Sequence, residues 1–344
     1  MITTTRLDAA LQSLAAGRPV IIIDDDGAEV VLSAQLADTH WTAWAIRHTS
    51  GLLCAALPAS RADELDVPAM SADARYRAQT TTFGVAVDAA EGVGTGISAT
   101  DRARTARTLA CPGSRPTDLT RPGHVLTVRT TDGGTLARSS KFEAAVDLCR
   151  LGRLEPVALT AALLDDDGAE IAASARTSFA YAHDVPIIDV RDVAHHRLHR
   201  GDGHRERVRP VSTRTVDVPE GTVHVVDYLD ELTGASHFAC VGVGTTATHP
   251  VHVIIESSHH DPFVSAAPSQ QDFEQQISRI AEEGGTVVYL RSYSWLRRRW
   301  AVSQDALMQG AAAAIVANLR RTQAEERNRQ TTNGASRAPQ PAPR

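Results

Sequence analysis

The chain has 344 residues, enough for two ordinary domains, and its 42% apolar and 22% charged residues are typical of a globular protein. The formal net charge of −6 argues against a general nucleic-acid binder, which needs a basic face to displace phosphate counterions. No apolar run approaches the roughly 20 residues that cross a bilayer, and the first residues lack the plan of a secretory signal. The four cysteines form no CxxC pair, which argues against a disulfide framework or a Cys-rich zinc module. We therefore expect a cytoplasmic protein with no nucleic-acid or membrane partner.

Hydrophobic periodicity predicts mixed helices and strands over the first 195 residues. An amphipathic helix is expected at 6–16, followed by a buried strand at 19–23 and a turn at 24–27. Further strands are expected at 29–33, 52–57, 83–88, 124–128 and 185–189, and helices at 38–48, 101–110, 141–151 and 169–183. These elements lack the strict alternation of a doubly wound sheet, so the predicted fold class is α+β.

The composition changes near residue 195. The basic, His-rich stretch 196–213 predicts a linker between a first domain at 1–195 and a second at 214–321. In the second domain, strands are expected at 219–228, 236–244, 250–256 and 287–290, and helices at 270–283 and 303–321. Residues 322–344 are polar and lack apolar periodicity, which predicts a disordered tail.

A glycine-rich segment of the first domain, Gly94–Arg102, places flexible backbone and hydroxyls just before a predicted helix. Such a loop can present N–H groups and hydroxyls to polyol or phosphate oxygens. In the plainer interpretation, Thr100 or Asp101 simply caps the helix. The two interpretations remain open at this point.

Three single residues also carry chemistry. His124 follows Pro122-Gly123 at the mouth of a strand, where an imidazole could transfer protons, although a lone histidine is more often structural. Arg138 follows the Gly133-Gly134 turn and could bind a phosphate, or could be an ordinary surface arginine. Cys54 closes a buried strand, where packing as a small apolar residue is the default interpretation.

Five ordered segments together resemble 3,4-dihydroxy-2-butanone 4-phosphate synthase, the lyase of riboflavin synthesis that converts ribulose 5-phosphate into a four-carbon ketone phosphate and formate. They are GRPVIIIDDD (17–26), IRHTSGLLCAAL (46–57), EGVGTGISATDRARTARTL (91–109), RPGHVLTVR (121–129) and GGTLARSSKFEAAVDLCRLG (133–152). The resemblance implies an α+β domain, a homodimer and an active site near the dimer contact. It implies catalytic positions at Asp24, Cys54, His124 and Lys141, and sugar-phosphate binding by Ser98, Thr100, Asp101, Arg102, Thr105, Arg138 and Glu143.

The sequence departs from this family at the metal site. The family's acidic loop, which supplies a catalytic glutamate and a magnesium ligand, is about four residues shorter here, and at most Glu29 remains of it. Lys141 stands at the histidine metal ligand, Phe142 at a phosphate-contacting threonine, and Ala162 at a further catalytic glutamate. Because an ammonium repels a divalent cation, we expect no bound metal and altered, metal-independent lyase or isomerase chemistry. Lys141 would then replace the charge of the cation, act as an amine nucleophile, or be a relic in a dead pocket.

The second domain faintly resembles GTP cyclohydrolase II, in a truncated form. The three zinc-binding cysteines of that family are missing, as is the remainder of its GTP-binding region, so zinc and cyclohydrolase activity are not expected. Two functions stay open for the whole chain. The first is a divergent synthase-like enzyme of riboflavin-related metabolism that binds a sugar phosphate. The second is an inactive paralogue that serves a true synthase or cyclohydrolase as scaffold or regulator.

Overall fold

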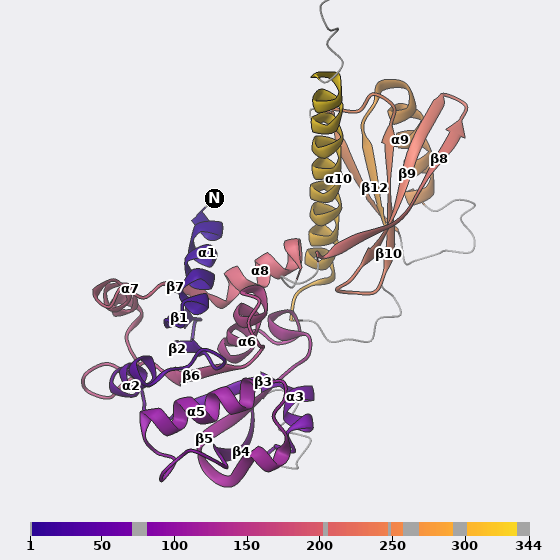
Figure 1. Ribbon diagram of the computed structural model, residues 1–344. Coiled ribbons are helices and arrows are strands. Elements are labelled where there is room, and N and C mark those ends of the chain that lie inside the picture. Colours follow the sequence, from indigo (N-terminus) through magenta and orange to yellow (C-terminus); the bar gives the residue numbers. More distant parts are fainter. Residues whose placement is uncertain are drawn as a thin grey trace, which may run out of the picture. The chain divides into compact units, whose positions relative to one another are not determined.

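The computed structural model describes residues 2–70, 81–201, 206–246, 249–256, 268–291 and 301–335. Its contacts divide the chain into two compact units, the first built mainly from Met1–Arg197 and the second mainly from Arg205–Arg297 and Ser303–Arg344 (Figure 1). Each unit combines one sheet with covering helices, which confirms the predicted α+β class. None of the helices in the described residues is long and apolar enough to cross a membrane.

The first unit is built on a seven-stranded mixed sheet in the order β4-β5-β3-β6-β2-β1-β7. Its strands are β1 (Val20–Ile23), β2 (Ala28–Ser33), β3 (Cys54–Pro58), β4 (Thr82–Ala89), β5 (Leu119–Thr130), β6 (Ala158–Ala162) and β7 (Ile187–Asp189). Its helices are α1 (Ile2–Ala15), α2 (Thr39–His48), α3 (Ala59–Glu64), α5 (Ala99–Ala110), α6 (Lys141–Leu151), α7 (Ala173–Ala182) and α8 (Val190–Arg200).

Helices cover both faces of this sheet, which explains why β2 and β3 are buried along their whole length. On one face, Leu7 of α1 and Leu148 of α6 pack against Val31 of β2. On the other face, Leu109 of α5 and Trp44 of α2 pack against alternate residues of the same strands. Because successive strand residues point to opposite faces, the face under α6 receives every second side chain of each strand.

The second unit contains a five-stranded sheet in the order β11-β12-β10-β9-β8. Its strands are β8 (Val208–Val218), β9 (Gly221–Asp230), β10 (Ser236–Gly242), β11 (Val251–Ile255) and β12 (Thr286–Leu290). Helix α9 (Pro268–Glu283) packs Ile277 and Ile280 against one face. Helix α10 (Gln304–Ala335) packs Met308 and Ile315 against the other, so the sheet lies between two helices (Figure 1).

The structure differs from the expected linker at 196–213. Helix α8 runs through to Arg200, and β8 begins at Val208 and pairs with β9. The basic side chains that suggested a solvated linker are partly buried in ion pairs, Arg197 with Asp147 at 2.8 Å and Arg207 with Asp230 at 3.0 Å. Composition alone could not indicate these partners, since each lies far away in the sequence.

The expected disordered tail differs as well, because α10 continues from Gln304 to Ala335. Residues 323–330 of this helix are mostly Gln, Ala, Glu and Arg, which favour helix even without an apolar face. The sequence prediction relied on apolar periodicity and therefore ended this helix at residue 321. Residues 336–344 lie outside the described part of the chain.

Candidate active site

Four of the predicted site residues, Asp24, Arg138, Lys141 and Glu143, make contacts at the start of α6. Ser140 caps this helix and accepts a hydrogen bond from the N–H of Glu143, so Lys141 is its first residue. The Lys141 ammonium donates to Oδ1 of Asp24 at 2.7 Å, and the two side chains are 15% and 25% exposed. The Asp24 carboxylate is held in turn by the N–H groups of Asp26 and Gly27 in the turn after β1. Asp24 and Lys141 thus form an ordered, half-buried ion pair.

Other carboxylates border the same ammonium. A methyl group placed on Gly27 would lie 3.7 Å from Lys141 Nζ and 3.5 Å from a carboxylate oxygen of Glu170. Glu29 in β2 is 8% exposed, and burial raises its pKa to about 7, an effect that the charge of Lys141 partly offsets. The negative charges of Asp24 and Glu170 raise it further. The site is therefore one ammonium surrounded by acidic groups.

Cys54 lies on the α6 face of β3, packed with Val128 of β5 and Val146 of α6. Burial, together with the negative charge of Glu29, raises the pKa of this thiol to about 12. At neutral pH Cys54 is an uncharged thiol, and it can pack or donate weakly but is a poor nucleophile. The structure thus supports its default interpretation as a small buried residue.

Arg138 is held by a fully buried carboxylate. Its Nε donates to Glu143 Oε1 at 2.8 Å, and its terminal nitrogen also contacts that oxygen. Glu143 further accepts from the hydroxyl of Ser140 and from the N–H of Thr131 at 3.1 Å. Glu143 therefore positions Arg138 and is itself 0% exposed, whereas the Arg138 side chain stays 19% exposed. The expectation that Glu143 binds substrate does not agree with this burial.

His124 is paired with a residue that sequence reasoning missed. Its Nδ1 lies 2.7 Å from Asp88 Oδ2, and its backbone N–H donates to Asp88 Oδ1 at 2.9 Å. This contact leaves Nε2 as the ring nitrogen available to other groups. Gly96 lies against this pair with φ +89°. A Cβ at this position would lie within 2.6 Å of both side chains, so a larger residue does not fit. The sequence feature that could have indicated Asp88 is its position as the single acidic residue near the end of β4.

The Gly94–Arg102 loop follows the capping interpretation, with a different cap from the two considered. Ser98 is the N-cap of α5 and accepts from the N–H of Asp101 at 3.1 Å. Burial opposes the ionisation of Asp101, but hydrogen bonds from the backbone of Gly94, from Ser98 and from the backbone of Gly96 outweigh it and lower its pKa. The Asp101 carboxylate therefore holds the loop in place through these hydrogen bonds.

Three further predicted binding residues hold this region together. The Thr105 hydroxyl accepts from the N–H of Ala89 at 2.9 Å, and the buried Arg102 donates to the carbonyl of Gly51 at 2.7 Å. Thr100 is more exposed and lies 3.2 Å from the hydroxyl of Thr39. These contacts tie α5 to β4 and to the segment before β3. These contacts account for Thr100, Arg102 and Thr105 without any bound ligand.

The residues present do not fit the magnesium site that the family resemblance implies. The Asp24 carboxylate, which could serve as an oxygen ligand, is already paired with the ammonium of Lys141. A divalent cation at this point would meet a positive charge at hydrogen-bond distance from its ligand. Among the residues that the structure describes, no group of three or more His, Cys, Asp or Glu side chains is arranged to hold a metal ion.

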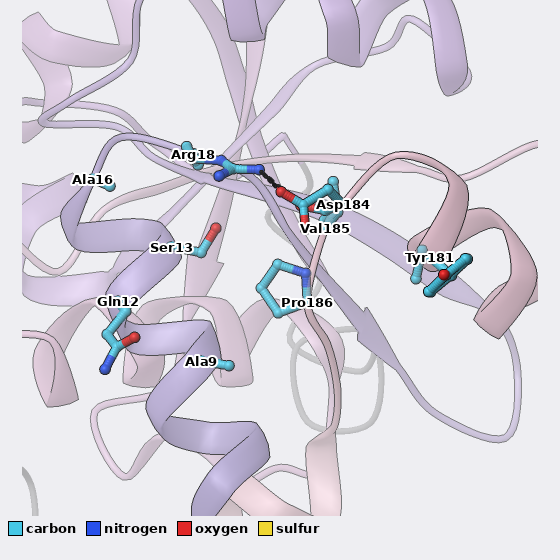
Figure 2. A pocket seen from close by; sticks show the side chains of 10 residues that line it. Ala9, Gln12, Ser13, Ala16, Arg18, Tyr181, Asp184, Val185 and Pro186 are labelled. Atoms are coloured by element: carbon cyan, nitrogen blue, oxygen red, sulfur yellow. Dashed lines mark hydrogen bonds and ion pairs between the residues drawn. The ribbon is translucent and has the colours of Figure 1, made fainter.

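A separate groove of about 470 Å³ lies between α1 and the segment that joins α7 to β7 (Figure 2). Its two charged lining residues, Arg18 and Asp184, pair with each other at 2.8 Å, as Figure 2 shows. Tyr181 at its edge is 89% exposed. None of the predicted site residues lines this groove.

Comparison with known proteins agrees with the fold. Residues 8–196 match the family model of 3,4-dihydroxy-2-butanone 4-phosphate synthase. The riboflavin biosynthesis protein RibBA of Salinispora tropica is 31% identical over 339 residues, which cover 96% of this chain and 80% of that protein. The 3,4-dihydroxy-2-butanone 4-phosphate synthase of Proteus mirabilis is 38% identical over 197 residues, covering 56% of this chain and 90% of its own.

A solved structure extends the likeness to both units. The crystal structure of RibBX, a two-domain 3,4-dihydroxy-2-butanone 4-phosphate synthase from A. baumannii, covers 91% of this chain and 90% of its own, with a TM-score of 0.62 and 24% identity. At that identity the likeness shows the fold alone. With the family model matching more than half of its length, the chain belongs to the 3,4-dihydroxy-2-butanone 4-phosphate synthase family.

Proposed function

We propose that the first unit binds ribulose 5-phosphate or a closely similar sugar phosphate and enolises it without a divalent cation. The observation that carries the proposal is the Lys141–Asp24 ion pair at 2.7 Å, which lies three residues along the chain from Arg138. A fixed ammonium and an arginine three positions apart in the sequence would provide positive charge for the reacting oxygens and for the phosphate of a ketose phosphate. The second unit has no assigned part in this chemistry.

Arg138 supports the phosphate-binding half of the proposal. Its guanidinium is held by Glu143, so little side-chain entropy is lost when a phosphate binds to it. Phe142, at the neighbouring position of α6, offers no hydrogen bond to a phosphate, so Arg138 would supply most of the affinity.

Lys141 supports the second half, in the role of a fixed charge. Enolisation places negative charge on the carbonyl oxygen of the sugar, and a pre-oriented ammonium stabilises that charge without rearranging. An amine nucleophile must instead approach the carbonyl carbon, whereas the Lys141 nitrogen is held by its hydrogen bond to Asp24. Of the roles considered for Lys141, the geometry therefore favours replacement of the cation's charge.

The inactive-paralogue alternative has its own supporting observation. Ser98, Asp101, Arg102 and Thr105 are explained by contacts within the fold, so their presence does not require a substrate. A scaffold that preserves the fold would preserve these four residues as well.

One experiment separates the two functions. The full-length protein, treated with a chelator and dialysed, is titrated with ribulose 5-phosphate by calorimetry and then incubated with it while formate and isomeric sugar phosphates are measured. We expect binding and metal-independent conversion. If no sugar phosphate binds, the proposal is wrong and the scaffold function is favoured.

A further inference from the structure

Helix α7 is held to the first unit by few contacts. Of its ten residues, all of which the structure describes, only Ala180 is fully buried. Its N-cap, Ala172, makes no side-chain hydrogen bond. A helix of this length without a cap is not stable by itself, because short helices gain most of their stability from packing. The order of α7 therefore depends on the contacts that dock it to its neighbours.

One of these contacts reaches the candidate site. Arg176 of α7 donates a hydrogen bond from Nη1 to the backbone carbonyl of Asp24 at 2.9 Å. That carbonyl belongs to the turn after β1, from which the Asp24 carboxylate accepts the hydrogen bond of Lys141. When α7 is docked, it therefore helps to hold this turn where Asp24 and Lys141 meet.

The other end of α7 is docked through two imidazoles. His183 follows the last residue of α7, His48 is the last residue of α2, and their ring centroids lie 4.6 Å apart. The Trp44 ring lies 4.9 Å from that of His48 and 5.5 Å from that of His183. Phe179 of α7 completes the cluster, at 5.8 Å from the first imidazole and 4.3 Å from the second. The two half-buried histidines thus join α2 to α7 within a group of aromatic rings.

The groups around His48 favour its neutral form. Burial lowers the pKa of this imidazole below its ordinary value, and the nearby His183 and Arg47 lower it further. Asp166, in the turn after β6, opposes them with a smaller effect. At neutral pH His48 is therefore uncharged and packs as an aromatic ring.

A second positive charge in this cluster would be unfavourable. The acidic residue next to His183 in the chain is Asp184, and it already pairs with Arg18 at 2.8 Å. One imidazolium is stabilised by the aromatic faces and by the C-terminal ends of the two helices. Two imidazolium rings at this spacing repel each other. Protonation of both histidines therefore opposes the contact that docks α7.

We infer that the His48–His183 pair is a pH-sensitive contact that keeps α7 docked at neutral pH and releases it in mild acid. Once α7 is released, both imidazoles face water and bind protons more tightly, so falling pH favours the released state. Release also removes the hydrogen bond from Arg176 to the Asp24 turn and lowers the activity of the first unit. This effect on activity rests on the proposed function, whereas the release of α7 does not.

The test measures the docking of α7 separately from activity. Hydrogen exchange of the full-length protein is followed by mass spectrometry at about pH 7.5 and about pH 5.5, on either side of the ordinary histidine pKa of about 6.5. Protection factors for peptides that cover residues 173–183 are corrected for the intrinsic pH dependence of exchange. The variants His48→Phe and His183→Phe keep an aromatic ring at each position and remove its charge. His40→Gln, which changes an exposed histidine at the start of α2, is the matched control.

We expect the protection of α7 to fall at least about tenfold from the higher to the lower pH in the unsubstituted protein and in His40→Gln. In His48→Phe and His183→Phe it should change by less than about threefold, because two like charges can no longer meet. Conversion of ribulose 5-phosphate, measured on the same proteins, should follow the protection of α7. Arg176→Met should convert slowly at both pH values, although its α7 stays protected at the higher one.

Equal protection of α7 at both pH values in the unsubstituted protein overturns the inference. A tenfold loss that persists in both Phe variants overturns it as well, since the histidine pair would then not be its cause. Loss of protection without loss of conversion also overturns it, because the Asp24 turn would not depend on α7. If the unsubstituted protein converts no sugar phosphate at either pH, the proposed function fails, while the exchange measurement still decides whether the histidine pair docks α7.

Discussion

The Nζ of Lys141 lies 2.7 Å from Oδ1 of Asp24, which joins the first residue of α6 to the turn after β1 across 117 positions of the sequence. Each partner is also fixed on its own side, Asp24 by two turn N–H groups and Lys141 by the capped start of its helix. An ammonium normally opposes the dipole of a helix start, so this position is unfavourable unless an acidic partner compensates for it. The ion pair supplies that compensation, and it fixes a positive charge at the centre of the site.

The fixed-charge role of Lys141 predicts that no Schiff base forms. Borohydride reduction in the presence of ribulose 5-phosphate should leave the intact mass of the protein unchanged. Lys141→Met should lose about 100-fold to 1,000-fold in conversion, the effect of removing a preorganised group that stabilises the developing oxyanion. Lys141→Arg, which keeps the charge, should retain more activity than Lys141→Met. A stable sugar adduct on Lys141 would show that the amine role is correct instead.

Arg138 should carry most of the affinity for the phosphate group. Arg138→Ala should weaken ribulose 5-phosphate binding by about 1.5–3 kcal/mol, as expected for hydrogen bonds to a charged group. Calorimetry measures this directly. The control is Arg150→Ala, which removes an arginine paired with Asp147 on the same helix and should leave binding unchanged. Equal affinity of Arg138→Ala and the unsubstituted protein would exclude Arg138 as the phosphate ligand.

Metal removal should have little effect. Because Lys141 engages the oxygen ligand that a cation would need, tag-free protein should contain less than one magnesium or zinc ion per chain by elemental analysis. Chelator treatment should leave sugar-phosphate binding and conversion unchanged. Loss of conversion on chelation, with recovery on adding magnesium, would contradict the metal-independent mechanism.

Sequence patterns predicted the elements that carry strong periodicity. The helix expected at 141–151 is α6, where apolar residues repeat with the helical period, and the strand expected at 19–23 is β1, a continuous apolar run from Val20. Patterns failed where long basic side chains are buried. Arg197 and Arg207 pair with Asp147 and Asp230, which lie 50 and 23 positions away in the sequence, and local composition therefore predicted solvent-exposed chain at 196–213.

Within the site, residue types were easier to predict than their partners. Lys141, Arg138 and His124 were candidates from the sequence, but their acidic partners Asp24, Glu143 and Asp88 could be paired with them only once the fold was known. Glu29 was visible only as the remnant of a shortened loop. That Glu29 faces Ala162 depends on the β2–β6 register, which no local sequence pattern specifies.

Glu29 should also make stability depend on pH. Its pKa rises from an ordinary value of 4.5 to about 7 on folding, so the folded protein binds more protons than the unfolded chain between these values. This proton contributes stability that is fully present below pH 4.5 and is lost as the pH rises through about 7. Relative to Glu29→Gln, the unsubstituted protein should therefore lose up to about 3 kcal/mol over this range. Denaturant unfolding of both proteins at several pH values measures the difference, and a difference that does not vary with pH would contradict the prediction.

Asp88 should act only through His124. Its carboxylate holds Nδ1 at 2.7 Å and fixes the direction of Nε2, so Asp88→Asn should lower conversion while leaving the affinity for the sugar phosphate nearly unchanged. His124→Gln should lower conversion further, by about 100-fold or more if the ring transfers a proton. Since both substitutions disable the same Asp88–His124 pair, the double variant should be no slower than His124→Gln alone. Rate measurements on the three variants and the unsubstituted protein complete the cycle. Additive losses would show that Asp88 contributes independently of the imidazole, for example by holding the Gly96 loop, and the positioning role would then be wrong.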